Sequence, residues 1–433
     1  MTNTDQQQTP ALARAGVAER LAGILEPLVG GDLPVRLTAW DGSAAGPAGA
    51  PEVQLNSANA LRRLLWNPGE LGAAQAYVTG ELDVPGPLDD ALSHLWAVLA
   101  ERGLSRPRIT PALVAQLTRL ARETGVLGRP LPAPASQARI TGRLHSLLRD
   151  RAAISHHYDL SNEFYQLILE EHMAYSCGYW LREDPAYTHA DAQRDKLDLV
   201  CRKLGLDTMP GQHFLDVGCG WGSLSLYAAE QFGAKVTGVT ISREQKAFIE
   251  ERIARRGLAD RVQVRLQDYR DVRDGPYDAA ASLEMGEHVG EENYGLFTSA
   301  LFRNVRPGGR VLIQQMSRRG RHPGGGPFIE SFIAPDMHMR PVGDTANLIE
   351  QAGFELLGVQ ALREHYVRSI EDWHQNLESN WERAIGLVGE ETARVWRLYL
   401  VGARMSFRDG RMGVDQFLAR RPAATRRGNP DTA

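Results

Sequence analysis

The segment that most constrains the fold is an apolar strand that runs into a glycine turn and then a helix. The strand is predicted over residues 213–217, the turn holds Gly218, Gly220 and Gly222, and the helix is predicted over 221–232. Glycines at such a turn let the backbone approach a ligand closely, because no Cβ stands in the way. Further strands are expected at 235–241, 261–266, 278–283 and 310–316, with helices at 191–205 and 243–257. This alternation predicts an α/β fold with a mostly parallel sheet and helices on both faces.

The first third of the chain is predicted to form a small mixed α+β domain without a catalytic motif. A helix is expected over residues 11–29, short strands over 35–40 and 52–55, and further helices within 56–101. A stretch rich in Gly and Pro at 127–138 is typical of a linker. These changes predict an N-terminal domain at residues 1–126, a linker at 127–140, the main α/β domain at 141–422 and a disordered tail at 423–433.

The charges and the cysteines exclude several classes of protein. Lys and Arg number 49 against 53 Asp and Glu, a formal charge of −4, whereas a nucleic-acid-binding protein usually has a strongly basic footprint. Cys177, Cys201 and Cys219 lack CxxC spacing, so we expect neither a disulfide framework nor a metal site. No run of about 18 apolar residues occurs, and the N-terminus lacks the pattern of a signal peptide. We therefore expect a cytoplasmic protein without a membrane span.

The glycine turn favours one cofactor over another. A dinucleotide site would have G-x-G-x-x-G and an acidic residue about 20 positions further on, whereas this turn has G-x-G-x-G, and residues 240–242 after the second strand contain no carboxylate. The turn instead resembles the S-adenosylmethionine site of class I methyltransferases. Asp216 can orient the turn and accept hydrogen bonds from the methionine ammonium, and the hydroxyls at 240–242 can bond the ribose. Asp268 and Tyr269, after the third strand, can hold the adenine.

Ordered motifs over residues 150–420 make the chain similar to the cyclopropane-fatty-acyl-phospholipid synthase family of lipid methyltransferases. The motifs are His157 to Asn162, Tyr175 to Cys177, the glycine turn, Thr240 to Ser242, Asp268 to Asp271, Glu284 to Gly290, Arg306 to Gly309, and His365 with Tyr366. The resemblance implies a class I methyltransferase domain with a Rossmann-like sheet and S-adenosyl-L-methionine as cofactor. It implies cofactor contacts from Tyr175, Ser176, Asp216, Gly218, Gly220, Thr240, Ser242, Gln245, Asp268 and Tyr269.

The reaction of this family explains the remaining residue types. Methyl transfer to a cis double bond leaves a carbocation on the acyl chain, and a base must then remove a proton. In this family the base is a bicarbonate ion, and the resemblance implies that Cys177, Glu287 and Tyr366 hold it here. Tyr158 is expected nearest to the reacting carbon, where an aromatic face stabilises a cation. Taken alone, Cys177 is typical of a small buried residue and Glu287 of a helix cap.

Gln314 departs from the cyclopropane-forming members, which usually carry His at this position. Glutamine donates hydrogen bonds but cannot become cationic, so anion binding or basicity is expected to differ. The branch that makes 10-methylene and 10-methyl fatty acids in actinobacteria resembles this sequence at Gln314. There, proton loss from the new methyl group gives an exocyclic methylene, and a separate flavin-dependent reductase completes the 10-methyl product. We therefore favour 10-methylene formation on an oleoyl-type phospholipid, with cyclopropane synthesis as the alternative.

Two other functions remain open at lower weight, namely a methyltransferase for a small polar or aromatic acceptor and a non-catalytic lipid-binding protein. The motif at 284–288 disfavours the first, and the intact glycine turn disfavours the second. The resemblance also implies a homodimer that contacts the phospholipid bilayer peripherally, at the inner membrane surface. Arg318, Arg319 and Arg321, beside a Gly-rich loop, are candidates for that contact.

Overall fold

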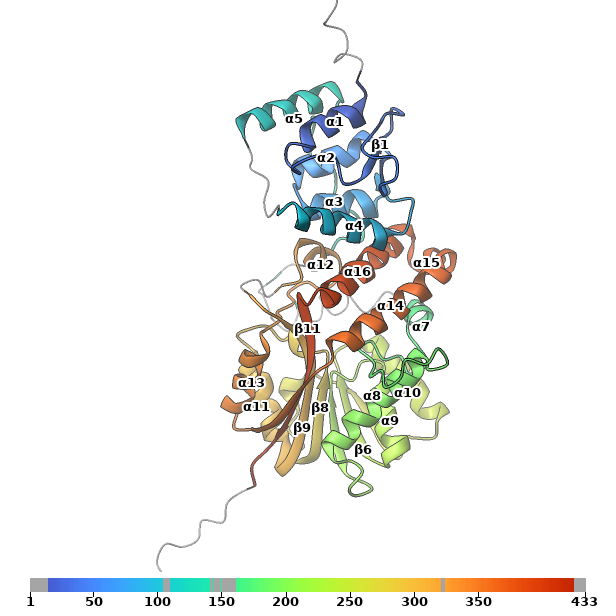
Figure 1. Ribbon diagram of the computed structural model, residues 1–433. Coiled ribbons are helices and arrows are strands. Elements are labelled where there is room, and N and C mark those ends of the chain that lie inside the picture. Colours follow the sequence, from blue (N-terminus) through green and yellow to red (C-terminus); the bar gives the residue numbers. More distant parts are fainter. Residues whose placement is uncertain are drawn as a thin grey trace, which may run out of the picture. The chain divides into compact units, whose positions relative to one another are not determined.

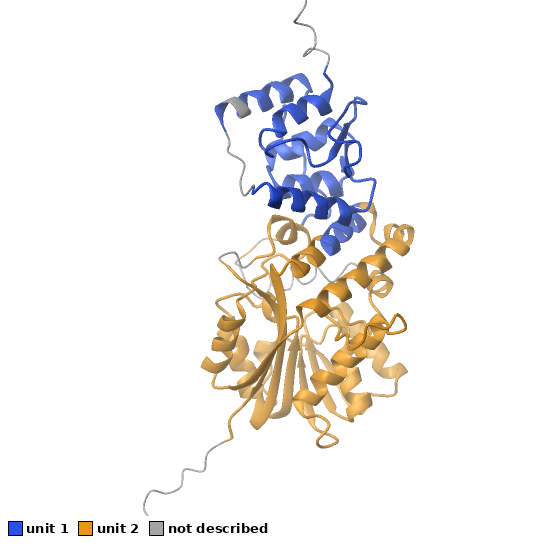
Figure 2. Cartoon of the chain, in the orientation of Figure 1, with its two compact units in different colours: residues 1–137, 391–401 blue, residues 138–390, 402–433 orange. Residues whose placement is uncertain are grey.

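The computed structural model describes residues 15–103, 110–140, 142, 149, 161–320 and 324–423 (Figure 1). The chain forms two compact units, one comprising residues 1–137 with 391–401 and the other residues 138–390 with 402–433 (Figure 2). The sequence-based division differs from these units. It placed 127–137 in a linker and 391–401 in the main domain, whereas both segments belong to the first unit. The expected tail lies outside the described residues apart from Ala423.

The first unit combines helices with a small mixed sheet. Its strand order is β2 (Ala44–Ala45), β1 (Arg36–Ala39), β3 (Glu52–Leu55) and β4 (Leu82–Asp83), and only β1 and β3 are parallel among these described pairs. Leu21, Leu37 and Leu55 are among the apolar side chains of its core. Its helices are α1 (Val17–Leu25), α2 (Ala58–Trp66), α3 (Glu70–Val78), α4 (Leu88–Glu101) and α5 (Pro111–Glu123).

Residues 391–401 complete this unit from a distant part of the sequence. They form the N-terminal part of α16 (Glu390–Arg408), from its second residue onward. Arg394 Nε donates to the backbone oxygen of Tyr77 at 2.7 Å, and Arg394 Nη2 donates to the Asp83 carboxylate at 2.8 Å. The guanidinium carbon also lies 4.3 Å from the centre of the Tyr77 ring. The buried arginine is thus both paired and stacked, which offsets the cost of removing its charge from water.

The second unit is built on a seven-stranded sheet. The strand order is β10 (Glu355–Ala361), β11 (Met412–Arg420), β9 (Val305–Arg318), β8 (Tyr277–Leu283), β5 (His213–Val217), β6 (Lys235–Thr240) and β7 (Val262–Leu266). The strands from β9 to β7 are parallel, whereas β11 is antiparallel to both β9 and β10. The chain order reverses at β5, and ligands of open α/β sheets bind at the carboxyl ends of the strands next to such a reversal.

Helices cover both faces of this sheet (Figure 1). Phe214 packs into a core with residues of α8, α9 and α10, whereas Leu215 packs into a second core with residues of α11 and α13. Neighbouring strand residues thus point to opposite faces, and both faces are buried. The helices of this unit are α7 (Asn162–Ile168), α8 (His189–Leu204), α9 (Ser223–Phe232), α10 (Arg243–Arg255), α11 (Tyr294–Asn304), α12 (Pro327–Phe332), α13 (Val342–Gln351), α14 (Arg363–Ser379), α15 (Trp381–Val388) and the ends of α16, with short 3-10 helices η1 (Tyr269–Asp271) and η2 (Gly286–His288).

The predicted α/β class, with a mostly parallel sheet covered on both faces, is confirmed. The strand at 213–217 has the predicted bounds, and the other predicted strands of the sheet agree within a few residues at most ends. Two strands, β10 and β11, were not predicted. No helix among the described residues is long and apolar enough to cross a membrane.

Candidate active site

The glycine turn after β5 requires its glycines for different reasons. Gly218, Gly220 and Gly222 all have positive φ, at 76°, 54° and 84°. A Cβ on Gly218 would lie 3.0 Å from Met285 Sδ, and one on Gly222 would lie 3.0 Å from Ile249 Cγ2. A Cβ on Gly220 would meet nothing within 4 Å. Gly220 therefore presents bare backbone to open space, as a turn that receives a ligand should.

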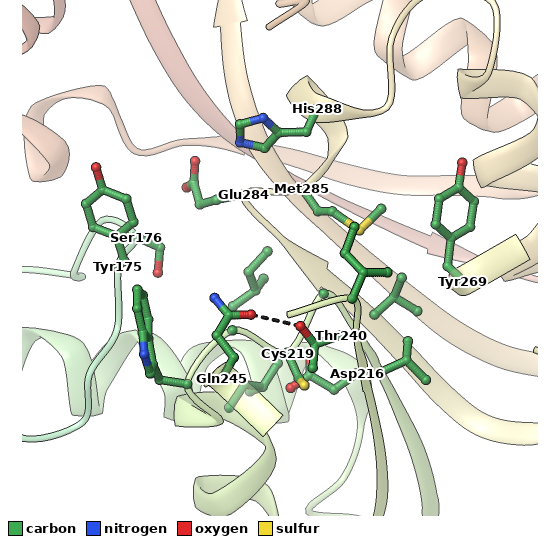
Figure 3. Close-up of a pocket in the computed structure, with 18 of the residues that line it drawn as sticks. Tyr175, Ser176, Asp216, Cys219, Thr240, Gln245, Tyr269, Glu284, Met285 and His288 are labelled. Carbon is green, nitrogen blue, oxygen red and sulfur yellow. Dashed lines mark hydrogen bonds between the residues drawn. The ribbon is translucent and has the colours of Figure 1, made fainter. Parts of the chain in front are cut away.

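A pocket opens beside this turn, at the carboxyl ends of the parallel strands (Figure 3). Tyr175 and Ser176 lie on one side of it, Tyr269 on the other, and Thr240 and Gln245 line it from β6 and α10. The predicted cofactor residues that line it are Tyr175, Ser176, Asp216, Gly218, Gly220, Thr240, Gln245, Asp268 and Tyr269. Ser242 is the exception, because its hydroxyl caps α10 by accepting from the backbone N–H of Gln245 at 3.2 Å. The structure thus brings nine of the ten residues together, while their contact with a cofactor stays a prediction.

Hydrogen bonds already orient several of these side chains. Ser225 Oγ donates to Asp216 at 2.7 Å, and Thr240 Oγ1 donates to Gln245 Oε1 at 2.8 Å (Figure 3). Arg270 donates to both carboxylate oxygens of Asp268, each at 2.8 Å. Burial raises the pKa of Asp216 to about 6, although the Ser225 hydroxyl favours the charged form. Several polar side chains of a largely apolar pocket are therefore held in place, among them the Asp216 carboxylate at the glycine turn.

A buried polar cluster adjoins the pocket and contains most of the predicted catalytic residues. Gln314 Nε2, on β9, donates to Glu284 Oε1 at 2.7 Å and lies 3.6 Å from Cys177 Sγ. Gln314 is fully buried. Burial raises the pKa of Cys177 well above its ordinary value, so its thiol is a neutral partner here. Of the predicted catalytic residues, Gln314 and Cys177 are therefore in direct contact.

Glu284 links this cluster to the pocket, and its role was not predicted. It follows β8 with φ of 53°, a conformation that costs a residue other than glycine about 1–3 kcal/mol. Its side chain lines the pocket, while its backbone N–H donates to the Gln314 carbonyl at 2.8 Å. The sequence signal was present, because Glu284 begins a motif directly after a parallel strand. Its orientation toward Gln314 follows only from the backbone conformation.

Glu287 lies in η2 with no exposed surface. Its carboxylate oxygens accept no hydrogen bond of normal geometry from an N–H or O–H group of the described residues, although the backbone amide of Met316 acts to lower its pKa. Burial raises the pKa of Glu287 well above the ordinary value, and the nearby Glu284 carboxylate raises it further. Glu287 is thus kept as a carboxylic acid or as part of a proton-sharing pair, which the helix-cap interpretation does not explain.

The two remaining predicted catalytic tyrosines have different outcomes. Tyr366, on α14, is 3% exposed and packs against Phe407, with ring centres 4.6 Å apart. Tyr158 lies outside the described residues. A further buried group, Lys196, was missed by the sequence analysis; its Nζ lies 2.8 Å from Ser176 Oγ, and burial lowers its pKa. Among the described residues, no group of three or more His, Cys, Asp and Glu side chains could hold a metal ion.

Comparisons with known proteins identify the family. Residues 145–417 match the family described as mycolic acid cyclopropane synthetase. The chain is 35% identical to a probable fatty acid methyltransferase of Pseudomonas putida, over 90% of this chain and 93% of the relative. It is 31% identical to the tuberculostearic acid methyltransferase UfaA1 of Mycobacterium tuberculosis, over 95% of each chain.

A solved structure supports the same assignment. The mycolic acid cyclopropane synthase CmaA1, complexed with SAH and CTAB, is 32% identical and superimposes with a TM-score of 0.58, covering 62% of this chain and 98% of that chain. The predicted family is confirmed by these similarities together with the sheet and the glycine turn. The chain belongs to the mycolic acid cyclopropane synthetase family of lipid-modifying methyltransferases.

Proposed function

We propose that the protein transfers a methyl group from S-adenosyl-L-methionine to the cis double bond of an oleoyl-type phospholipid chain, and that proton loss then gives a 10-methylene chain. The family membership supports a methyltransferase that acts on fatty acyl substrates. The observation that carries the finer proposal is the contact between Gln314 and Glu284 beside the cofactor pocket. The neutral amide of Gln314 stands where the cyclopropane-forming branch usually has a histidine, and here it donates to the carboxylate of Glu284.

The pocket residues fit the cofactor. When bound, S-adenosyl-L-methionine supplies an electrophilic methyl group on a positively charged sulfur. Gly220 leaves open space next to the turn, and Asp216 offers a carboxylate beneath it for an ammonium group. Thr240 and Gln245 present polar atoms for ribose hydroxyls, and Tyr269 presents a ring for the adenine. Ser242 acts by fixing the start of α10.

The buried cluster provides what the second half of the reaction needs. Proton loss from the new methyl group requires a base in surroundings that exclude water. Cys177, Glu287 and Gln314 are each less than 1% exposed, so this part of the site is shielded from bulk solvent. A bicarbonate ion held near Cys177, Glu287 and Tyr366 is one source of the base under this proposal. Fixed negative charge in such a site also stabilises the carbocation that precedes proton loss.

The proposal includes three partners. The substrate requires peripheral contact with a phospholipid bilayer at the inner membrane surface, a flavin-dependent reductase would convert the methylene product to the 10-methyl chain, and the active form is a homodimer. Relatives named as fatty acid and tuberculostearic acid methyltransferases support an acyl-chain acceptor.

Product analysis tests the proposal. The protein is incubated with S-adenosyl-L-methionine and dioleoyl phospholipid vesicles, and the released acyl chains are analysed by mass spectrometry and NMR. We expect each modified chain to gain one carbon and to show the NMR signals of a C=CH2 group. A cyclopropane signal alone would establish the alternative product. Unchanged acyl chains, together with methylation of a small polar acceptor, would contradict the proposed substrate class.

A further inference from the structure

A directed chain of hydrogen bonds ends on Glu284. Lys203 Nζ, from α8, donates to Gln416 Oε1 on β11 at 2.6 Å. Gln416 Nε2 donates to Gln314 Oε1 on β9 at 2.8 Å, and Gln314 Nε2 donates to Glu284 Oε1 at 2.7 Å. Gln314 and Gln416 are paired residues of neighbouring antiparallel strands. We name Lys203, Gln416 and Gln314 the amide relay.

The hydrogen bonds of the amide relay can run in only one direction, from Lys203 to Glu284. A lysine ammonium donates hydrogen bonds and accepts none, so it must face the carbonyl oxygen of the Gln416 amide. The amino group of Gln416 then faces the oxygen of Gln314, whose amino group is left for Glu284. A carboxylate accepts and therefore ends the series. The relay thus fixes Glu284 in its left-handed backbone conformation, together with the backbone bond from Glu284 N–H to the Gln314 carbonyl.

At the end of the relay, several carboxylate oxygens could still accept a hydrogen bond. Oε2 of Glu284 and both carboxylate oxygens of Glu287 are buried, and no N–H or O–H group of the described residues donates to them. The two carboxyl groups are close enough for each to affect the other's pKa. Of the two, Glu284 lines the cofactor pocket, whereas Glu287, in η2, is not among the lining residues. Two buried carboxylates that affect each other in this way cannot both be ionised at low cost.

We propose that Glu284 and Glu287 hold a single proton between them, and that Glu284, oriented by the amide relay, accepts the proton lost from the methylated acyl chain in place of a bicarbonate ion. This inference rests on the proposed function and adds to it the group that takes the proton. The relay residues are positioning residues, because they act through Glu284.

The reaction balances with these groups alone. The alkene pair forms the new bond to the methyl carbon as its bond to sulfur breaks, which leaves a thioether and a cation on the neighbouring chain carbon. A hydride then shifts from the methylated carbon to the neighbouring cation, which places the positive charge on the carbon that bears the new methyl group. A C–H bond of that methyl group supplies the electron pair of the new C=CH2 double bond. Its proton goes to the singly charged pair, which becomes neutral. The proton then leaves to solvent when the products depart.

The charges around the pair favour a single negative charge. Burial raises the pKa of both carboxyl groups. The buried Lys196 opposes this effect at Glu284, whereas Asp415 adds to it. The titratable and charged groups that act on the pair are Lys196, Asp415, Cys177 and Tyr294, the last of which faces Arg340. A pair with one shared proton carries one negative charge, and the buried Lys196 cation lies close enough to act on it.

Glu284→Gly is the decisive variant, because glycine adopts positive φ without strain. We expect it to fold with an unchanged or higher melting temperature and to bind S-adenosyl-L-methionine within threefold of the wild type. Its methyl-transfer turnover on oleoyl phospholipid should fall about 10²–10⁴-fold, the usual contribution of a general base. Turnover within threefold of the wild type would overturn the inference.

Relay variants test the positioning role. Gln416→Leu should lower turnover about tenfold and displace the acidic limb of its pH profile. Gln360→Leu is the matched control, since Gln360 Oε1 also accepts from Lys203 but leads away from Glu284. It should retain wild-type turnover and pH profile. Equal effects of the two variants would show that the relay acts only through general stability.

A measurement without substrate separates this inference from the proposed function. Infrared difference spectra of the whole protein labelled with ¹³C-glutamate should show one protonated carboxyl group at pH 7 that disappears in both Glu284→Gly and Glu287→Gln. Its absence in the wild type would refute the shared proton even if the 10-methylene product forms. Its presence in a wild type that leaves oleoyl chains unchanged would instead refute the proposed substrate.

Discussion

Ser225 donates a hydrogen bond to the Asp216 carboxylate at 2.7 Å, which joins the first turn of α9 to the strand that precedes the glycine turn. Both side chains are buried, so the bond fixes the geometry of the turn between them. The carboxylate nevertheless remains costly for the fold, because burial raises its pKa from 3.8 to about 6.

The first prediction follows from this cost. Between pH 3.8 and about 6 the folded protein binds more protons at Asp216 than the unfolded chain does, so this group's contribution to stability falls as pH rises through that window. Asp216→Asn removes up to about 3 kcal/mol of that penalty at pH 7. We expect its melting temperature at pH 7 to equal or exceed that of the wild type, while calorimetry shows cofactor affinity reduced at least tenfold. Wild-type affinity would contradict a role in cofactor binding.

Gly220→Val should block the cofactor. Its side chain would enter the open space beside the turn, and positive φ would also lower stability by about 1–2 kcal/mol. Gly211→Val is the matched control, because Gly211 has φ of 77°, open space around its Cβ position and no place in the pocket lining. Both variants should lose similar stability in denaturant titrations, and only Gly220→Val should lose cofactor binding. Equal affinities would remove the turn from the site.

Glu287→Gln tests the second carboxyl group. We expect turnover to fall about 10²–10⁴-fold, as for loss of a base, while cofactor affinity survives. Stability should not fall, because no N–H or O–H group of the described residues donates to this carboxyl, and an amide carries no charge for burial to penalise. Turnover is measured by methyl incorporation and stability by thermal unfolding. Near-normal turnover would reduce Glu287 to a structural role.

Gln314→His should change the product. The wild type is expected to give mainly 10-methylene chains, and the variant a raised cyclopropane fraction, because imidazole can become cationic and cannot reproduce both relay contacts of the amide. NMR of the released acyl chains measures both products. Gln315→His would not serve as a control, since Gln315 is itself buried and bonded to Tyr294. The products of the wild type and of Gln314→His are therefore compared after the same number of turnovers. An unchanged ratio of methylene to cyclopropane product would show that other residues determine the product.

The fifth prediction concerns the membrane. Arg318 is half-buried, with a hydrogen bond to the Gly324 carbonyl, whereas Arg319 is exposed; Arg321 lies outside the described residues. Replacing all three by Ser should weaken binding to anionic vesicles most strongly at low salt, since each cation contributes about 1 kcal/mol. A triple Ser variant at exposed helical arginines, Arg194, Arg202 and Arg255, makes the same change in charge. Vesicle binding of both variants is measured by co-sedimentation. An equal loss of binding in the two variants would show that net charge, and not this surface, accounts for the effect.

The parts of the fold that could be predicted are those with local signals. The strand at 213–217 is a short apolar run beside a glycine turn, so its bounds follow from the sequence. Of the residues predicted to contact the cofactor, Gly218, Gly220, Asp268 and Tyr269 follow parallel strands, whereas Tyr175, Ser176 and Gln245 were predicted from the family resemblance. Strand β11 was missed, since its hydrogen-bond partners on β9 lie about a hundred residues earlier.

The amide relay could not be predicted for the same reason. Gln314 and Gln416 meet only through the antiparallel register of two strands, and Lys203 reaches them from α8. The sequence did single out Gln314, but as a departure from a histidine and not as the support of a carboxylate. The role of Glu284 depends on a single positive φ, which no local pattern indicated.

The membership of residues 391–401 in the first unit limits how this architecture can be rearranged. A gene fragment that encodes only residues 1–137 would leave Tyr77 and Asp83 without the arginine that bonds both of them. An exchange of that fragment between homologues would set a native Arg394 against foreign partners. The first unit therefore cannot be exchanged as one continuous stretch of the gene. A chimera needs residues 391–401 to be transferred together with residues 1–137.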